Sequence, residues 1–295
     1  MQLWEIVLAF QNCNGESSIG FKQYLITDEI IELEGEEFET SNCYNYILSD
    51  VEKLLTKSIL NLLSSDAALQ KGLYSWSYVS SYYASHFIFQ AINRLHLDFS
   101  VYVNSYFNCR YKNYLDQTLI IKRGDKSSDT HQREYSQYYQ KVANMKTIPS
   151  PDRYWNLACS AFPNGNEVSL RNDINYVLNK NSYNEFELTN IELDRMIGEL
   201  TSDPFNTRMR SGQVADVAHL SMKYAASRIR SLIFILNKIA NGSSIYRSYF
   251  QKNIHNRKSK ITTFFDDKAS EWLVEFLNRI LVFNEEITEE VLYEK

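Results

Sequence analysis

The segment 170–176, LRNDINY, contains the side chains best suited to act on a phosphate group. It places Arg171 next to Asn172 and ends on Tyr176. A guanidinium can bind two phosphate oxygens at once, and an amide can orient the bound group. A Tyr with a pKa of about 10 can donate a hydrogen bond but is a poor general base. The alternative interpretation is that Arg171 and Asn172 bind backbone carbonyls or carboxylates where helices pack.

A second group of candidate binding residues lies in 246–260, which we predict to be a loop. It interleaves cations with the aromatic residues Tyr246, Tyr249 and Phe250. Cations beside stacking surfaces hold single-stranded nucleic acid without reading its sequence. The alternative is an ordinary solvated connector, since Asp266 and Asp267 follow and partly offset the charge. The basic side chains that would contact nucleic acid are Arg247, Lys252, His255, Arg257, Lys258 and Lys260.

The sequence contains no other catalytic signature. No HExxH, Walker loop, GxSxG or GxGxxG occurs, so the metalloprotease, P-loop NTPase, serine hydrolase and Rossmann classes lack support. The four cysteines stand far apart without a CxxC pair, which predicts free buried thiols and not a zinc site. We therefore expect no metal and no cofactor. His86 and His219 lie in apolar helical stretches, where a hydrogen-bonded core or interface histidine is the common case.

The composition favours long helices. The 295 residues include only nine Gly and four Pro, which disfavours a turn-rich all-β fold. The formal charge of −5 means that nucleic-acid binding would need a local basic patch. The N-terminus has no basic region ahead of its apolar run, and no apolar run is long enough to span a bilayer. These features predict a soluble, cytoplasmic protein that does not associate with membranes.

The segment 73–95, LYSWSYVSSYYASHFIFQAINRL, is the predicted centre of the fold. It is apolar nearly all round, as expected of a helix with neighbours on several sides, and its serines would let another helix come close. A second long buried helix is predicted over 213–240. Its apolar row includes Arg228, which would need a carboxylate or an anion if buried. In the first helix we expect the core residues to be Trp76, Tyr83, Phe87, Ile88 and Leu95.

The N-terminal region differs in pattern from the rest. The short apolar runs in 3–10, 20–27 and 29–35 predict two or three strands of a small antiparallel sheet. A helix is expected to begin at Ser49, because Ser49 and Glu52 have capping-box spacing. The segments 99–107 and 117–123 can be strands or extended segments laid over helices.

The predicted fold is therefore mostly α, a helical bundle around two long buried helices with a small N-terminal antiparallel β element. Residues 1–48 would form the β-containing edge and residues 49–295 the bundle, together in one continuous domain.

The pattern YxxxYYAxxF in 78–87 and the Arg-Asn pair near a helix start in 168–177 resemble the HEPN superfamily (higher eukaryotes and prokaryotes nucleotide-binding). The resemblance implies a helical bundle, often dimeric. Many members are metal-independent ribonucleases in toxin–antitoxin, abortive-infection or CRISPR-linked defence. It therefore implies RNA or a nucleotide as ligand, a homodimer, and a partner protein of the same microbial system.

The sequence departs from the HEPN signature, which is an Arg, a polar residue and, a few residues later, a His. Tyr176 stands at the His position. No Arg is followed by a His with four to six residues between, and Arg123–His131 and Arg247–His255 each have seven. A His suits the chemistry because it titrates near neutral pH.

By resemblance, Arg171 would bind the scissile phosphate of RNA and Asn172 would orient it. Tyr176, or a His brought in by the fold or by a second subunit, would move protons. The alternative function belongs to another class, a non-catalytic interaction subunit whose helical surface docks a partner enzyme.

Overall fold

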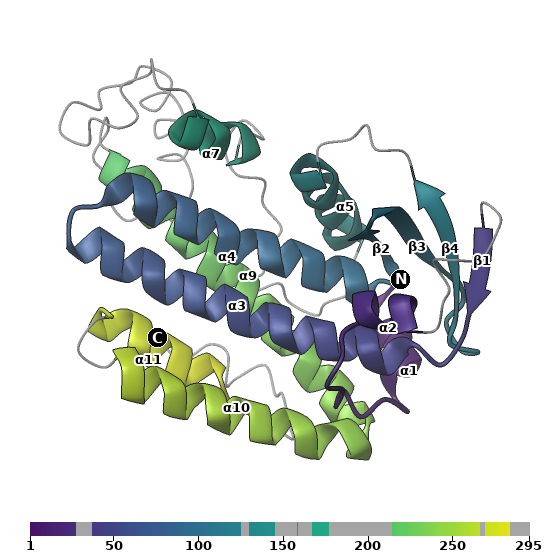
Figure 1. The fold of residues 1–295 in the computed structure, drawn as a ribbon. Helices are drawn as coiled ribbons and strands as arrows, with labels where there is room; N and C mark the ends of the chain where they lie inside the picture. The colour runs from purple at the N-terminus through teal and green to yellow at the C-terminus, as the bar shows by residue number, and fades with distance from the viewer. Residues whose placement is uncertain are drawn as a thin grey trace.

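A computed structural model of the chain describes residues 1–27, 37–124, 130–144, 158, 167–176, 214–265 and 269–283. The described part is mostly helical, with a small antiparallel sheet at one end (Figure 1). This confirms the predicted fold class. No helix in these ranges is long and apolar enough to cross a membrane.

The centre of the bundle is an antiparallel helix pair, α3 (Tyr44–Gln70) and α4 (Tyr74–Leu95), with α9 (Val214–Gly242) packed across it (Figure 1). Small hydroxyl side chains line the contacts. Ser58 Oγ donates to the Ala84 carbonyl at 2.7 Å, and Ser81 Oγ donates to Ser221 Oγ at 2.6 Å. Side chains of this size let helix axes approach closely, and each of these two buried hydroxyls has an acceptor. The serine row, the central helix and the second long helix are therefore as the sequence predicted.

The prediction for the core of α4 is wrong at Trp76, whose side chain is 61% exposed. Ile88 and Leu95 are buried as expected, whereas Tyr83 and Phe87 are only partly buried. Helices α3, α9 and α5 (Thr130–Asn144) cover the other sides of α4. One face of α4 therefore remains open to solvent, although its residues are as apolar as those of the buried faces.

The N-terminal strand predictions are also wrong for 3–10 and 20–27, because these segments form helices α1 (Leu3–Phe10) and α2 (Phe21–Thr27). In α1 the buried residues Ile6, Ala9 and Phe10 recur at helical spacing and pack into the core. The Glu5 carboxylate accepts the Gln2 backbone N–H at 2.5 Å, so the first turn is capped. The third predicted strand, 29–35, lies outside the described residues.

The helix predicted from Ser49 begins earlier, at Tyr44, and the predicted division at residue 48 falls inside α3. Ser49 is therefore not a cap. Its buried hydroxyl donates to the Ser17 carbonyl at 3.1 Å, and the Glu52 side chain is buried against α10 (Ser244–Phe265). The capping-box spacing was coincidental here because both side chains have tertiary partners.

The sheet takes one strand from the N-terminal region, β1 (Glu37–Thr40), and three from the segment after α4. These are β2 (Asp98–Val103), β3 (Ser105–Asn113) and β4 (Thr118–Gly124), and the order is β1-β4-β3-β2 with all neighbours antiparallel. Asn104, at a φ of 55°, makes the tight turn between β2 and β3. Cys109 of β3 pairs with both Phe99 and Ile121, and all three are buried. The predicted N-terminal β element is thus one strand of a sheet built mainly from 98–124.

Candidate functional site

Arg171 lies in the second turn of α7 (Glu167–Tyr176), against the outer side of α4. Its Nη1 donates to Asn172 Oδ1 at 2.7 Å and its Nη2 donates to the Tyr83 hydroxyl. The guanidinium carbon is 5.3 Å from the ring centroid of Tyr83 and 5.8 Å from that of Tyr82. Aromatic faces at this range attract a cation. The residue is 8% exposed, so Arg171 and Asn172 are brought together at the rim of the core.

A buried ion pair fixes α7 one turn before Arg171. Glu167, the first residue of α7, accepts two hydrogen bonds from Arg228 of α9, at 2.8 and 3.1 Å, and both side chains are fully buried. Tyr139 accepts a third hydrogen bond from Arg228 at 2.7 Å, and Tyr78 donates to the Glu167 carbonyl at 3.1 Å. The prediction that a buried Arg228 would need a carboxylate is confirmed. This network holds Arg171 at a defined position beside Tyr83.

Two histidines that the sequence analysis did not assign to the site lie next to Tyr83. His86 of α4 and His131 of α5 have ring centroids 4.2 Å apart. The Tyr83 ring is 6.5 Å from that of His86 and 6.1 Å from that of His131. His131 Nδ1 shares a hydrogen bond of 2.9 Å with the Tyr82 hydroxyl, and His86 Nε2 lies 3.1 Å from Gln90 Nε2. We call Arg171, Tyr82, Tyr83, His86 and His131 the Arg–His cluster.

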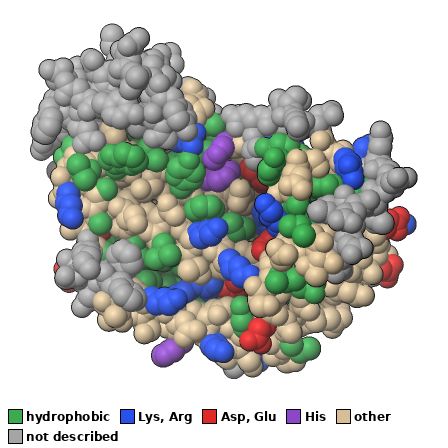
Figure 2. Space-filling view, viewed as in Figure 1, with side chains coloured by type: hydrophobic (Ala, Val, Ile, Leu, Met, Phe, Trp, Pro, Cys, Tyr) green, Lys and Arg blue, Asp and Glu red, His purple; other side chains and the backbone are tan. Residues whose placement is uncertain are grey.

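The two imidazoles differ in environment. His86 is 5% exposed, whereas His131 is partly exposed. Figure 2 shows histidine side chains at the surface of this face, between the positions of α5 and α7 in Figure 1. Burial, together with the charges of His131 and Arg171, lowers the pKa of His86 to about 3. His86 is therefore neutral at physiological pH.

The cluster can bind an anion and move protons. A phosphate near Arg171 would gain charge-assisted hydrogen bonds, which are stronger than those between neutral groups. Imidazoles are the side chains best matched to proton transfer near neutral pH. The sequence search missed both histidines because it looked for a His a few residues after an Arg, whereas these histidines come from other helices. The available signal was His86 itself, one helical turn after Tyr83.

Tyr176 is the last residue of α7, and its side chain is outside the described residues. Its predicted role therefore stays a prediction. His219, the other histidine expected in the core or an interface, is exposed on α9.

The predicted basic loop at 246–260 is wrong as a loop, because the segment belongs to helix α10. Tyr246, Phe250 and Ile254 recur every four residues and are buried, which is helical periodicity. Tyr249 and Arg247 are partly exposed, and Arg247 donates to the Ala240 and Asn241 carbonyls at 3.3 Å each, near the end of α9.

Arg257 is also occupied within the fold. It is 7% exposed, and its Nη2 donates to Glu52 Oε2 at 2.5 Å and to the Glu52 carbonyl at 2.9 Å. Its Nε donates to Thr56 Oγ1 at 3.1 Å. The predicted nucleic-acid residues that still reach solvent are Arg247, Lys252, His255, Lys258 and Lys260.

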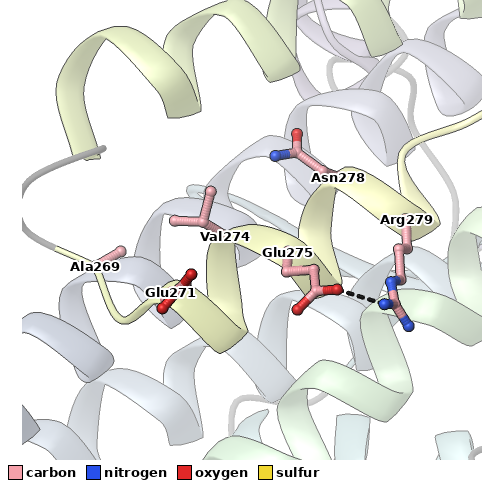
Figure 3. Close-up of a pocket in the computed structure, with 6 residues that line it drawn as sticks. All are labelled: Ala269, Glu271, Val274, Glu275, Asn278 and Arg279. Atoms are coloured by element: carbon pink, nitrogen blue, oxygen red, sulfur yellow. Dashed lines mark hydrogen bonds and ion pairs between the residues drawn. The ribbon is translucent and has the colours of Figure 1, made fainter.

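A hollow of about 630 Å³ lies on α11 (Glu271–Ile280), away from the Arg–His cluster (Figure 3). The ion pair drawn in it, between Glu275 and Arg279, is exposed and spans one turn of the same helix. Such pairs are common on solvated helices and indicate no chemistry. The lining residues are Ala269, Glu271, Val274, Glu275, Asn278 and Arg279.

The described residues contain no arrangement suited to binding a metal ion or to thiol chemistry. Within them, no three His, Cys, Asp or Glu residues are grouped so that they could hold a metal ion. Cys13, Cys43 and Cys109 are free and buried, as predicted for three of the four cysteines. Burial raises the pKa of Cys13 and Cys43 to about 12, so both thiols stay protonated.

Comparison with known proteins gives no relative from which a role could be transferred. No protein-family model matches the chain, no curated protein matches it, and no solved structure matches it. The Arg–His cluster is therefore interpreted from its own geometry.

Proposed function

We propose that the protein is an RNA-engaging, HEPN-like component of a microbial defence or toxin-type system, with a metal-independent endoribonuclease site at the Arg–His cluster. The observation that supports this is the convergence of a guanidinium and two neighbouring imidazoles around Tyr83. The fold thus supplies the histidines that the segment after Arg171 lacks. The cytoplasm is the proposed location, and a homodimer the proposed assembly.

In the proposed reaction, Arg171 binds the non-bridging oxygens of the scissile phosphate and Asn172 orients its guanidinium. The RNA 2′-hydroxyl loses its proton to a neutral imidazole and attacks the adjacent phosphorus. The bond from phosphorus to the 5′-oxygen breaks, and that oxygen takes a proton from an imidazolium. The products are a 2′,3′-cyclic phosphate and a free 5′-hydroxyl.

The environments of the histidines suggest which of them moves the protons. Two imidazoles with centroids 4.2 Å apart disfavour a second positive charge on the pair. His86, whose pKa is lowered to about 3 by burial, is too weak a base to accept a proton and stays neutral. His131, which is partly exposed, therefore accepts the proton of the 2′-hydroxyl and returns it to the 5′-oxygen.

The test is cleavage of single-stranded RNA in EDTA by the wild type and by His131→Ala. Loss of a general acid typically lowers the rate by about 10²–10⁴-fold. His219→Ala is the matched control, because His219 is exposed on α9 and is neither part of the cluster nor among the predicted nucleic-acid residues. The nuclease function is wrong if the wild type leaves RNA intact, or if both variants reduce cleavage equally.

The second candidate is a non-catalytic interaction subunit that docks a partner enzyme of the same system. Three exposed apolar side chains favour this interaction role. They are Leu60 on α3, Leu73 in the turn after it and Trp76 on α4. Large apolar groups in water often mark protein contacts. An inert wild type, together with loss of partner binding in Trp76→Ala, would support this candidate over the nuclease.

A further inference from the structure

We infer that the open face of α4 is a stacking surface for the bases of single-stranded nucleic acid leading into the Arg–His cluster. The inference rests on the proposed function and specifies its substrate as unpaired, with bases free to stack. The surface consists of Trp76, Ser80, Tyr83 and Phe87, which we call the outer row of α4.

These residues share one face because they are spaced by four, three and four positions along the helix. Trp76 is 61% exposed, and Tyr83 and Phe87 are partly exposed. Trp76 and Tyr83 are seven residues apart, about 10 Å along the helix axis. The rings of Tyr83 and Phe87 are 6.4 Å apart. The row thus offers successive aromatic groups along one line.

Positive charge accompanies the aromatic groups along this face. Lys57 of α3 holds its Nζ 5.6 Å from the Phe87 ring centroid, and Lys57 and Lys53 are both exposed. Arg171 contacts Tyr83 from the α7 side. Figure 2 shows hydrophobic side chains over α4 next to histidines, and Lys and Arg side chains over the neighbouring helices.

This combination favours single-stranded nucleic acid over a protein partner. Bases stack on aromatic side chains while cations bind the phosphates between them. A paired duplex hides the base faces within its own stack, so it would gain little from Trp76. An apolar protein surface would cover Lys57 and remove its charge from water without replacing the lost hydration. Stacking on Trp76 and Phe87 would place a neighbouring phosphate near Arg171.

The experiment measures binding without cleavage. A labelled single-stranded DNA oligonucleotide lacks the 2′-hydroxyl that the proposed reaction needs, so its anisotropy reports affinity alone. Trp76→Ala should weaken binding by a factor of about 5–150, since stacking on one aromatic contributes about 1–3 kcal/mol. Trp272→Ala is the matched control, because Trp272 is 45% exposed on α11.

A second pair of variants tests the phosphate contact. Lys57→Ala should weaken binding and reduce the slope of log affinity against log salt by about 1, as expected when one phosphate contact is lost. Lys122→Ala is its control, because Lys122 is exposed on β4 of the distant sheet. The same oligonucleotide annealed to its complement should bind more weakly than the single strand.

The outcomes separate this inference from the nuclease proposal. Unchanged affinity in Trp76→Ala, equal losses in Trp272→Ala, or no binding by the wild type would overturn the stacking surface even if RNA is cleaved. A wild type that binds the single strand through Trp76 but leaves RNA intact would support the surface and refute the nuclease.

Discussion

At the scale of single residues, Arg228 and Arg171 show that the role of an arginine depends on which groups accept its hydrogen bonds. Arg228 is fully buried and faces the Glu167 carboxylate with two hydrogen bonds, so its charge is neutralised within the core. Arg171 lies at the rim, beside the rings of Tyr82 and Tyr83, and donates to an amide and a phenol. A neutral acceptor gives way to a phosphate far more readily than a carboxylate does. Arg171 is therefore the better candidate ligand for an anion.

Arg171→Lys should impair RNA cleavage well beyond its effect on stability. Lys keeps the charge but lacks the planar fork that binds two oxygens. Loss of one charge-assisted hydrogen bond, about 1.5–3 kcal/mol, lowers the rate about 10–150-fold. Cleavage in EDTA and thermal melts of both proteins provide the measurement, with the exposed Arg279→Lys as control. A structural Arg171 would instead show stability and activity falling together.

Tyr176→His tests whether proton transfer belongs to the end of α7, because it restores the residue that the HEPN signature has there. The new imidazole would titrate near neutral pH, where the phenol does not. The Arg–His cluster already moves the protons in the proposed reaction, so we expect the variant to cleave RNA in EDTA at the wild-type rate. A clear gain in cleavage would instead assign proton transfer to the end of α7.

The sequence could predict Arg171 and Asn172 as site residues, but it could not predict which side chains from other helices lie beside them. Arg171 and Asn172 are neighbours in the chain and were found together. His86 and His131 meet only because α4 and α5 pack side by side. No spacing rule along one segment contains that information, since the contact is set by tertiary packing.

At the scale of elements, α7 owes its position to Glu167. Glu167→Gln should destabilise the protein by about 3–5 kcal/mol, because it leaves the Arg228 charge buried without a counter-ion. It should also lower Arg171-dependent cleavage, since α7 would lose its anchor on α9. Urea unfolding measures the first effect and the RNA assay the second.

The matched control is Glu275→Gln, which breaks the exposed pair with Arg279 on α11. Exposed pairs contribute about 0–1 kcal/mol, so this variant should unfold almost as the wild type does. An equal loss of unfolding free energy in the two variants would show that burial does not make the Glu167–Arg228 pair stronger than the exposed pair. Glu167 would then not be an anchor of α7.

The elements that were predicted correctly are those with long, strong periodicity. Helices α4 and α9 bury most of their circumference, so their apolar pattern extends over many turns. Helices α1 and α2 are short, and a short apolar run fits a strand as well as a helix until its packing is known. The helix α10 was missed because charged residues interrupt its apolar pattern. One of them, Arg257, is buried and points inward to Glu52. Buried ion pairs make a helical face look polar in the sequence.

At the scale of the whole molecule, the core contains imidazoles that must stay neutral. His86 is 5% exposed and His96 is 2% exposed, and burial lowers the pKa of each to about 3. The unfolded chain has a His pKa of about 6.5. Between these values the unfolded state binds more protons than the folded state, so stability is complete above pH 6.5 and falls as the pH is lowered towards 3.

The last prediction is that urea unfolding between pH 6.5 and 5 loses stability by up to about 1.4 kcal/mol per pH unit for each of these two histidines. This range lies above the ordinary pKa of exposed carboxyl groups, so the histidines dominate it. Replacing both with Gln should flatten the dependence, because the protons that the unfolded imidazoles take up are then absent. His255→Gln is the matched control, since His255 is exposed on α10. A slope that survives the double replacement would show that His86 and His96 are not the source of the acid sensitivity.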